Sequence, residues 1–136
     1  MSRIYLDACI AIYVVEKHID YAERIENLIN DLDVNDALCY SPLVRLKCFV
    51  KLFQEKDLVL QKLFESLFKH QEILEITAER FDKASQLRAD FASLKTPDAL
   101  HLATARYHNC TEFWTNDNRL NEVAPSLARN ILLDQS

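Results

Sequence analysis

Residues 3–7 read Arg-Ile-Tyr-Leu-Asp, an apolar segment that closes on an aspartate. This segment predicts a short buried strand, and Asp7 falls where the strand ends. Similar apolar segments recur along the chain, at residues 37–40, 72–76, 111–115 and 130–133. The stretches between them have helical spacing, and a repeated strand–helix order is typical of a parallel sheet with helices on both faces. The sequence therefore predicts an α/β fold, a three-layer α/β/α sandwich around a mostly parallel sheet.

The expected helices occupy the intervening stretches, at residues 8–16, 20–32, 42–55, 58–68, 78–94, 96–109 and 118–123. Ser41, Asp57 and Thr77 are expected to cap the helices that follow them. In the helix over 42–55, the residues expected to face inward are Leu43, Leu46, Val50 and Phe53. The chain has no glycine, so helix ends and turns must use other residues, and Asn30, Asn35 and Asn109 stand where helices are expected to stop. The absence of glycine also excludes P-loop hydrolases and the dinucleotide-binding fingerprint.

Composition indicates a globular protein of one domain, residues 1–136, with 49% hydrophobic and 27% charged residues. No stretch approaches the roughly 18 uninterrupted apolar residues of a membrane span. The chain enters its first strand at once, without room for a signal peptide, so a cytoplasmic protein is expected. The four cysteines lack zinc-site spacing and are expected to be small buried hydrophobes.

Three aspartates occupy positions that suit metal ligands. Asp7 and Asp117 each follow an expected strand, and Asp98 lies in the first turn of the helix over 96–109. Ligands gather at the carboxyl ends of strands in open α/β sheets, and oxygen-only sites favour Mg²⁺ or Mn²⁺. A carboxylate-held ion can activate water and brace a phosphodiester during in-line displacement. The net charge of −5 is unusual for a protein that binds nucleic acid, and acids clustered around a cation would explain part of it.

Three patches resemble the PIN-domain family, and specifically the VapC-type toxins of toxin–antitoxin pairs. They are Tyr-Leu-Asp at 5–7, Pro-Asp-Ala-Leu-His-Leu-Ala-Thr-Ala at 97–105 and Thr-Asn-Asp at 115–117. The resemblance implies an Mg²⁺- or Mn²⁺-dependent endoribonuclease in which Asp7, Asp98 and Asp117 hold the metal and act in catalysis. It implies supporting hydrogen bonds from Thr115 and Asn116. It also implies an RNA substrate, a homodimer and an antitoxin protein that silences the cleft, where it can supply an arginine.

The family usually has a fourth acid, a glutamate, in the helix after the second strand, and Lys47 stands at that position here. An ammonium about 4 Å from a divalent ion is repelled by roughly 2 kcal/mol in water and by more at lower effective dielectric. It would instead pair with Asp7 or Asp98 and take part of the cation's place. The expectation is weakened metal binding and little or no hydrolysis, with Lys47 as a detoxifying change that Lys47→Glu would reverse.

Other interpretations stay open. Each aspartate can simply cap or favour a helix N-terminus, worth roughly 0.3–1 kcal/mol for Asp98. His101, one turn beyond Asp98, is expected to be a packed, satisfied histidine rather than a general base. Lys47 supports a catalytically silent PIN-like module that binds RNA or an antitoxin. A phosphatase with Asp7 as nucleophile would need a second acid where Cys9 stands, and a receiver domain would need paired acids near residue 7.

Overall fold

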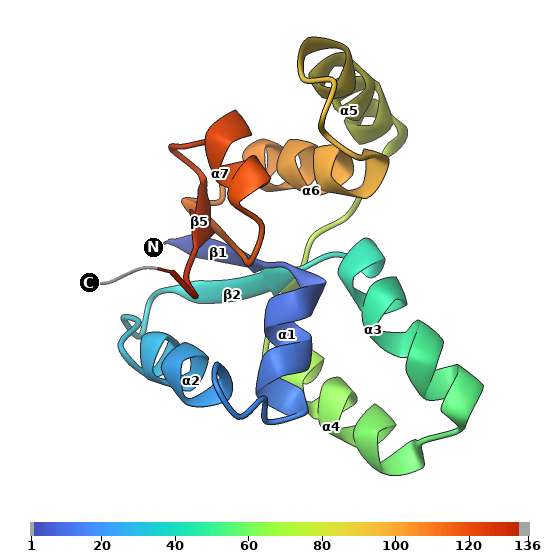
Figure 1. The fold of residues 1–136 in the computed structure, drawn as a ribbon, viewed down its shortest axis with the longest axis vertical. Coiled ribbons are helices and arrows are strands. Elements are labelled where there is room, and N and C mark those ends of the chain that lie inside the picture. The colour runs from blue at the N-terminus through green and yellow to red at the C-terminus, as the bar shows by residue number, and fades with distance from the viewer. Residues whose placement is uncertain (1, 134–136) are drawn as a thin grey trace.

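The computed structural model describes residues 2–133, and this range contains five strands and seven helices. The strands are β1 (Arg3–Leu6), β2 (Ala37–Tyr40), β3 (Glu72–Ile73), β4 (Glu112–Thr115) and β5 (Ala128–Asn130). The helices are α1 (Ala8–Val15), α2 (Ala22–Asn30), α3 (Pro42–Glu55), α4 (Leu58–Lys69), α5 (Ala78–Asp90), α6 (Thr96–Tyr107) and α7 (Asn118–Val123). Helices α3 and α4 extend from the sheet as a hairpin, and α5 packs on α6 (Figure 1).

The five strands form one parallel sheet in the order β3-β2-β1-β4-β5. Strand β1 is central, with Tyr5 opposite Cys39 on β2 and Phe113 on β4. The chain runs from β1 to β2 on one side, whereas β4 joins β1 on the other side, so the winding of the sheet reverses between β1 and β4. Ligands of open parallel sheets bind at the carboxyl ends of strands beside such a point. The sheet therefore brings Asp7, after β1, next to Asn116, after β4.

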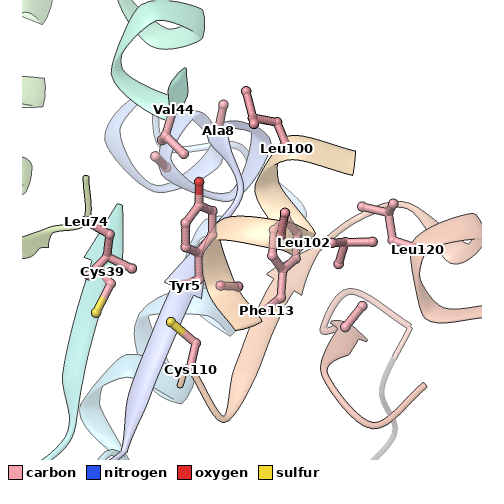
Figure 2. Packing of buried hydrophobic residues seen from close by; sticks show 14 of the residues in the cluster. Tyr5, Ala8, Cys39, Val44, Leu74, Leu100, Leu102, Cys110, Phe113 and Leu120 are labelled. Atoms are coloured by element: carbon pink, nitrogen blue, oxygen red, sulfur yellow. The ribbon is translucent and has the colours of Figure 1, made fainter. Parts of the chain in front are cut away.

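The sheet divides the core into two clusters of buried residues. On one face, Ile4, Leu6 and Trp114 pack with Ile10 of α1 and Ile25 of α2. On the other face, Tyr5 and Phe113 pack with side chains from α3, α4, α5, α6 and α7. Their rings stack with centroids 5.1 Å apart, and Figure 2 shows them side by side between β2 and α6. This alternation along β1 and β4 confirms the predicted three-layer α/β/α sandwich.

The last strand was predicted at 130–133, which is wrong except for Asn130, because β5 spans Ala128–Asn130. After β5 the backbone turns, since the Asn130 side-chain oxygen accepts from Leu132 N–H at 3.1 Å and the Asn130 carbonyl accepts from Leu133 N–H at 3.3 Å. Ile131 is nevertheless fully buried in the cluster with Trp114. Burial of a turn residue therefore made this segment resemble a strand.

The predicted inward face of α3 is wrong for three of its four residues, since only Leu43 packs against the core. Leu46, Val50 and Phe53 are 58%, 48% and 59% exposed. The buried residues of α3 are instead Val44, Cys48, Phe49 and Leu52. This helix is apolar on two stripes, so periodicity alone did not select the one that meets the core.

Within residues 2–133, three non-glycine residues adopt positive φ: Lys17 at 54°, Lys56 at 53° and Asn109 at 58°. Asn109 follows α6 as predicted, and α2 ends at Asn30 as predicted, although neither Asn30 nor Asn35 adopts positive φ. The two lysines adopt the left-handed conformation that glycine or asparagine more often adopts.

Helix α5 was predicted to run to residue 94, but it ends earlier, at Asp90.

The four cysteines are free thiols; Cys39, Cys48 and Cys110 are buried and Cys9 is half-buried. Within residues 2–133, no helix combines the length and apolar character that crossing a membrane requires.

Candidate functional site

A cleft of about 380 Å³ opens at the carboxyl ends of β1 and β4. Its walls come from the start of α1, from α3, from the N-terminus of α6 and from the loop that leads into α7. The lining includes all three predicted aspartates, Asp7, Asp98 and Asp117, together with Asn116 and Lys47. Residues far apart in sequence are thus brought to one place, as the strand order requires.

Asp7 is the most buried of the three acids, at 7% exposure. One carboxylate oxygen accepts from the Ala8 N–H at 2.7 Å and so caps α1, while the other accepts from the Thr115 hydroxyl at 2.9 Å. Thr115 Oγ1 in turn accepts from the Asp117 N–H at 3.2 Å. Thr115 therefore links the acid after β1 to the loop after β4, and it lies beneath the cleft rather than in it.

Asp98 lies half-buried in the first turn of α6. Burial, and then the negative charge of Asp7, raise the pKa of Asp98 above its usual value, while Lys47 opposes the shift. Within residues 2–133 its carboxylate makes no hydrogen bond, which leaves Asp98 as the acid of the cleft most available to a ligand.

Asp117 is held by Arg119. The two Arg119 nitrogens Nε and Nη2 lie 3.1 and 2.6 Å from Asp117 Oδ1 and Oδ2, and the Arg119 N–H also donates to Oδ1 at 2.9 Å. These contacts cap α7 and lower the pKa of Asp117. Both oxygens of the Asp117 carboxylate are thus occupied by a bidentate ion pair with Arg119.

Charge in the cleft is balanced. Its three acids face three cations, which are Lys47, Lys95 and Arg119. Lys47 is half-buried and acts electrostatically on Asp98 and on His101. The charge of Lys47 therefore acts inside the cleft, beside the acids with which the sequence predicted it to interact.

His101 lies fully buried below Asp7. Its Nδ1 is 2.7 Å from the Tyr5 hydroxyl, which is 2.6 Å from Ser41 Oγ. Its Nε2 is 4.0 Å from Asp7 Oδ1 and has no hydrogen-bond partner in the described part of the chain. Burial lowers the pKa of His101 to about 4, so the ring is neutral at physiological pH. The histidine is packed as predicted, but only one of its nitrogens is satisfied. Ser41 is the N-cap residue of α3 as predicted, but its hydroxyl contacts Tyr5 and makes no capping hydrogen bond to the backbone of the helix.

The donor set fits a divalent metal poorly. Both Asp117 oxygens contact Arg119, and Lys47 adds a positive charge. Across residues 2–133, no group of three or more histidine, cysteine, aspartate or glutamate residues is close enough to hold a metal ion. Asp7 and Asp98 remain as the two carboxylates of the cleft that no arginine holds, because the third, Asp117, is paired with Arg119.

Sequence reasoning missed Lys95, Arg119 and Asn130. Lys95 directly precedes the Thr-Pro-Asp start of α6, and Arg119 lies two residues beyond Asp117, so both could have been found as cations beside a motif acid. Asn130 braces the cleft loop from β5, because its amide donates to Asn116 O at 3.1 Å and to Asn118 Oδ1 at 2.9 Å. No sequence signal distinguishes Asn130, since its role depends on β5 lying beside β4.

The fold and the acidic cleft together define a parallel α/β protein with its polar site at the central strand ends. Residues 4–125 match the model of the PIN domain, and the chain therefore belongs to the PIN domain family. No curated protein matches the sequence.

Several solved structures share the fold. The chain is similar to FitAcB from Neisseria gonorrhoeae, with 16% identity over 96% of this chain and 99% of that one, at a TM-score of 0.77. It is similar to VapBC2 from Rickettsia felis bound to a promoter DNA fragment, with 18% identity over 93% and 97% of the chains, at a TM-score of 0.74. It is also similar to VapC20 from Mycobacterium tuberculosis, a toxin that cleaves the sarcin–ricin loop, with 11% identity over 88% and 93%, at a TM-score of 0.73. The fold is thus that of VapC-type PIN proteins.

Proposed function

We propose that this chain is the toxin of a toxin–antitoxin pair, with a cleft derived from a metal-dependent endoribonuclease and disabled in this sequence by Lys47. The observation that carries the proposal is the meeting of Asp7, Asp98 and Asp117 in one cleft at the ends of β1 and β4. Residues 1–136 would act as one PIN-like domain in the cytoplasm, where RNA is the substrate.

The roles follow from how each acid is held. Asp98, without a hydrogen-bond partner in residues 2–133, and Asp7, oriented by Ala8 and Thr115, would be the principal ligands of Mg²⁺ or Mn²⁺. Asp117 would act through water only when Arg119 moves away from it. Asn116 lines the cleft with an exposed side chain, which donates to the Tyr13 hydroxyl at 3.1 Å and would have a second N–H for a scissile phosphate. A metal held by such carboxylates would supply Lewis-acid chemistry for water and phosphate.

Lys47 acts against that chemistry in this chain. Its ammonium neutralises part of the acid charge that would attract a cation, and it leaves no carboxylate to complete the ligand set. The cleft remains suited to bind an RNA phosphate, because Lys47, Lys95 and Arg119 line it. We therefore expect RNA binding with little hydrolysis.

An antitoxin protein is the proposed partner, together with a second copy of this chain in a homodimer. The surface of the α3–α4 hairpin exposes large apolar side chains, namely Leu46, Val50, Phe53, Leu58, Val59 and Leu63. Large exposed apolar side chains gathered on one pair of helices are typical of protein-binding sites. A similar structure from Klebsiella pneumoniae is a toxin–antitoxin complex by name, which supports the same assignment here.

A catalytically silent PIN-like module is the second candidate. The bidentate contact of Arg119 with Asp117 favours it, because this contact adds to Lys47 in filling the cleft with the chain's own cations. Such a module would bind RNA or an antitoxin without cutting.

The deciding experiment compares Mn²⁺ titration and RNA cleavage by the chain and by Lys47→Glu. Lys51→Glu is the matched control, because Lys51 lies on the same helix, is exposed and does not line the cleft. We expect Lys47→Glu alone to bind Mn²⁺ and cut RNA. Cleavage by the unmodified chain that Asp7→Ala abolishes would disprove the disabling role of Lys47. A folded but inactive Lys47→Glu protein would favour the silent module.

A further inference from the structure

A chain of buried polar groups runs beneath the cleft. Ser41, Tyr5 and His101 are each fully buried, and their side chains are linked by the contacts of 2.6 Å and 2.7 Å. Figure 2 shows the Tyr5 hydroxyl directed away from β1 toward the region of Val44, at the start of α3. Because these groups are buried, each hydrogen must find an acceptor or remain unsatisfied at a cost of about 1–3 kcal/mol.

The direction of the hydrogen bonds follows from Ser41. Its hydroxyl has no other partner in residues 2–133, so it donates to Tyr5, and Tyr5 then donates to His101 Nδ1. The opposite direction would leave the Ser41 hydrogen unsatisfied. It would also turn the lone pair of His101 Nε2 toward the carboxylate of Asp7. A neutral ring that accepts at Nδ1 carries its hydrogen on Nε2.

We propose that His101 is a positioning residue for Asp7, with its Nε2–H aimed at Asp7 Oδ1 from a tautomer that Tyr5 and Ser41 fix. At 4.0 Å the contact is longer than a hydrogen bond, so it acts as an N–H dipole directed at the carboxylate. It adds to the two hydrogen bonds that Asp7 accepts, from the Ala8 N–H and the Thr115 hydroxyl. The placement of the hydrogen is independent of the proposed function, and only its consequence for RNA cleavage rests on that function.

The tautomer is measurable on the unmodified chain, without metal or RNA, by ¹⁵N NMR of the histidine rings at neutral pH. We expect His101 to show a protonated Nε2 and an unprotonated Nδ1. Tyr5→Phe removes the donor to Nδ1 and should shift His101 toward a mixture of tautomers. Tyr107→Phe is the control, because Tyr107 is exposed and its ring contacts His108 rather than His101. A predominant Nδ1–H tautomer in the unmodified chain would overturn the inference.

The link to Asp7 has its own measurement. Asp7→Asn removes the negative charge that faces Nε2, so the Nε2 and Hε2 resonances of His101 should move while the tautomer stays the same. Unmoved resonances in a folded Asp7→Asn protein would show that the ring does not act on Asp7.

The functional consequence is tested in the Lys47→Glu background. His101→Gln retains an N–H donor and should keep RNA cleavage within about threefold, whereas His101→Leu should lose about 10–100-fold, as for other residues that orient a ligand. Equal activity of the two variants would reduce His101 to a packing residue. If Lys47→Glu itself is inactive, the proposed function fails, and the NMR result still decides the inference.

Discussion

At the scale of single residues, Thr115 connects the two sides of the cleft. Its fully buried hydroxyl donates to Asp7 and accepts from the Asp117 N–H. Thr115→Val keeps the shape of the side chain and removes both contacts, and a hydrogen bond to a charged group contributes about 1.5–3 kcal/mol. We expect the free energy of unfolding in urea to fall by about that amount.

Thr111→Val is the control for this prediction, because Thr111 is exposed and its hydroxyl makes only a 3.3 Å contact, with the Arg3 carbonyl, in the described residues. Its effect should stay within about 0.5 kcal/mol. Equal effects of the two substitutions would mean that the bridge between Asp7 and Asp117 contributes nothing.

Arg119 gives the cleft a pH dependence of definite sign. Its side-chain contacts lower the pKa of Asp117 in the folded protein below the unfolded value. The stabilisation is therefore fully present above the unfolded pKa and is lost as pH falls through the folded pKa. Arg119→Gln should raise the midpoint of the Asp117 carboxyl titration, measured by ¹³C NMR. A midpoint that does not change would show that Arg119 does not hold Asp117 in solution.

At the scale of elements, α3 has one face that packs in the core and another, exposed face that is the proposed protein-binding surface. Phe49 is buried at 4% exposure, whereas Phe53, one turn later, is 59% exposed. Phe49→Ala should cost about 3–5 kcal/mol of unfolding free energy, whereas Phe53→Ser should change it by less than about 1 kcal/mol. Urea denaturation of the two variants checks the observed orientation of the helix.

Phe53→Ser has a second expected effect, because the exposed face of the α3–α4 hairpin is the proposed protein-binding surface. The variant should weaken self-association in sedimentation experiments while it stays folded. A large loss of stability in Phe53→Ser would instead mean that Phe53 packs inward, as periodicity predicted.

The strands show what local sequence determines. β1, β2 and β4 were predicted within one residue, because each is a short apolar segment that ends at a polar or charged residue. The bounds of β5 and the buried face of α3 were predicted incorrectly. In each case two neighbouring groups of apolar residues were candidates, and tertiary packing decides which of them forms the strand or meets the core. The turns at Lys17 and Lys56 were missed for a related reason: in a chain without glycine, tertiary packing places ordinary residues at positive φ.

At the scale of the whole molecule, the cleft could be located from sequence but its charge could not. The parallel order of strands requires the residues after β1 and β4 to meet, so Asp7, Asn116 and Asp117 were predictable neighbours. Lys95 and Arg119 are recognisable in the sequence as cations beside motif acids, but their place in the cleft depends on how α6 and α7, which begin at these residues, are packed in the fold. Three acids balance three cations inside the cleft, so the net charge of −5 arises from residues outside it.

That balance predicts how the molecule responds to a change at residue 47. Lys47→Glu places a fourth carboxylate beside Asp7, Asp98 and Asp117, so the variant should melt below the unmodified chain in the absence of divalent ions. A cation that binds only the folded state restores stability, by about 2.7 kcal/mol at one hundred times its dissociation constant. Addition of Mn²⁺ should therefore raise the melting temperature of Lys47→Glu well above any change in the unmodified chain. Lys51→Glu carries the same change of charge outside the cleft, so its melting temperature should hardly respond to Mn²⁺. An equal response of both variants would mean that the ion binds the surface charge rather than the cleft, and that Lys47 does not stand in the place of a cation.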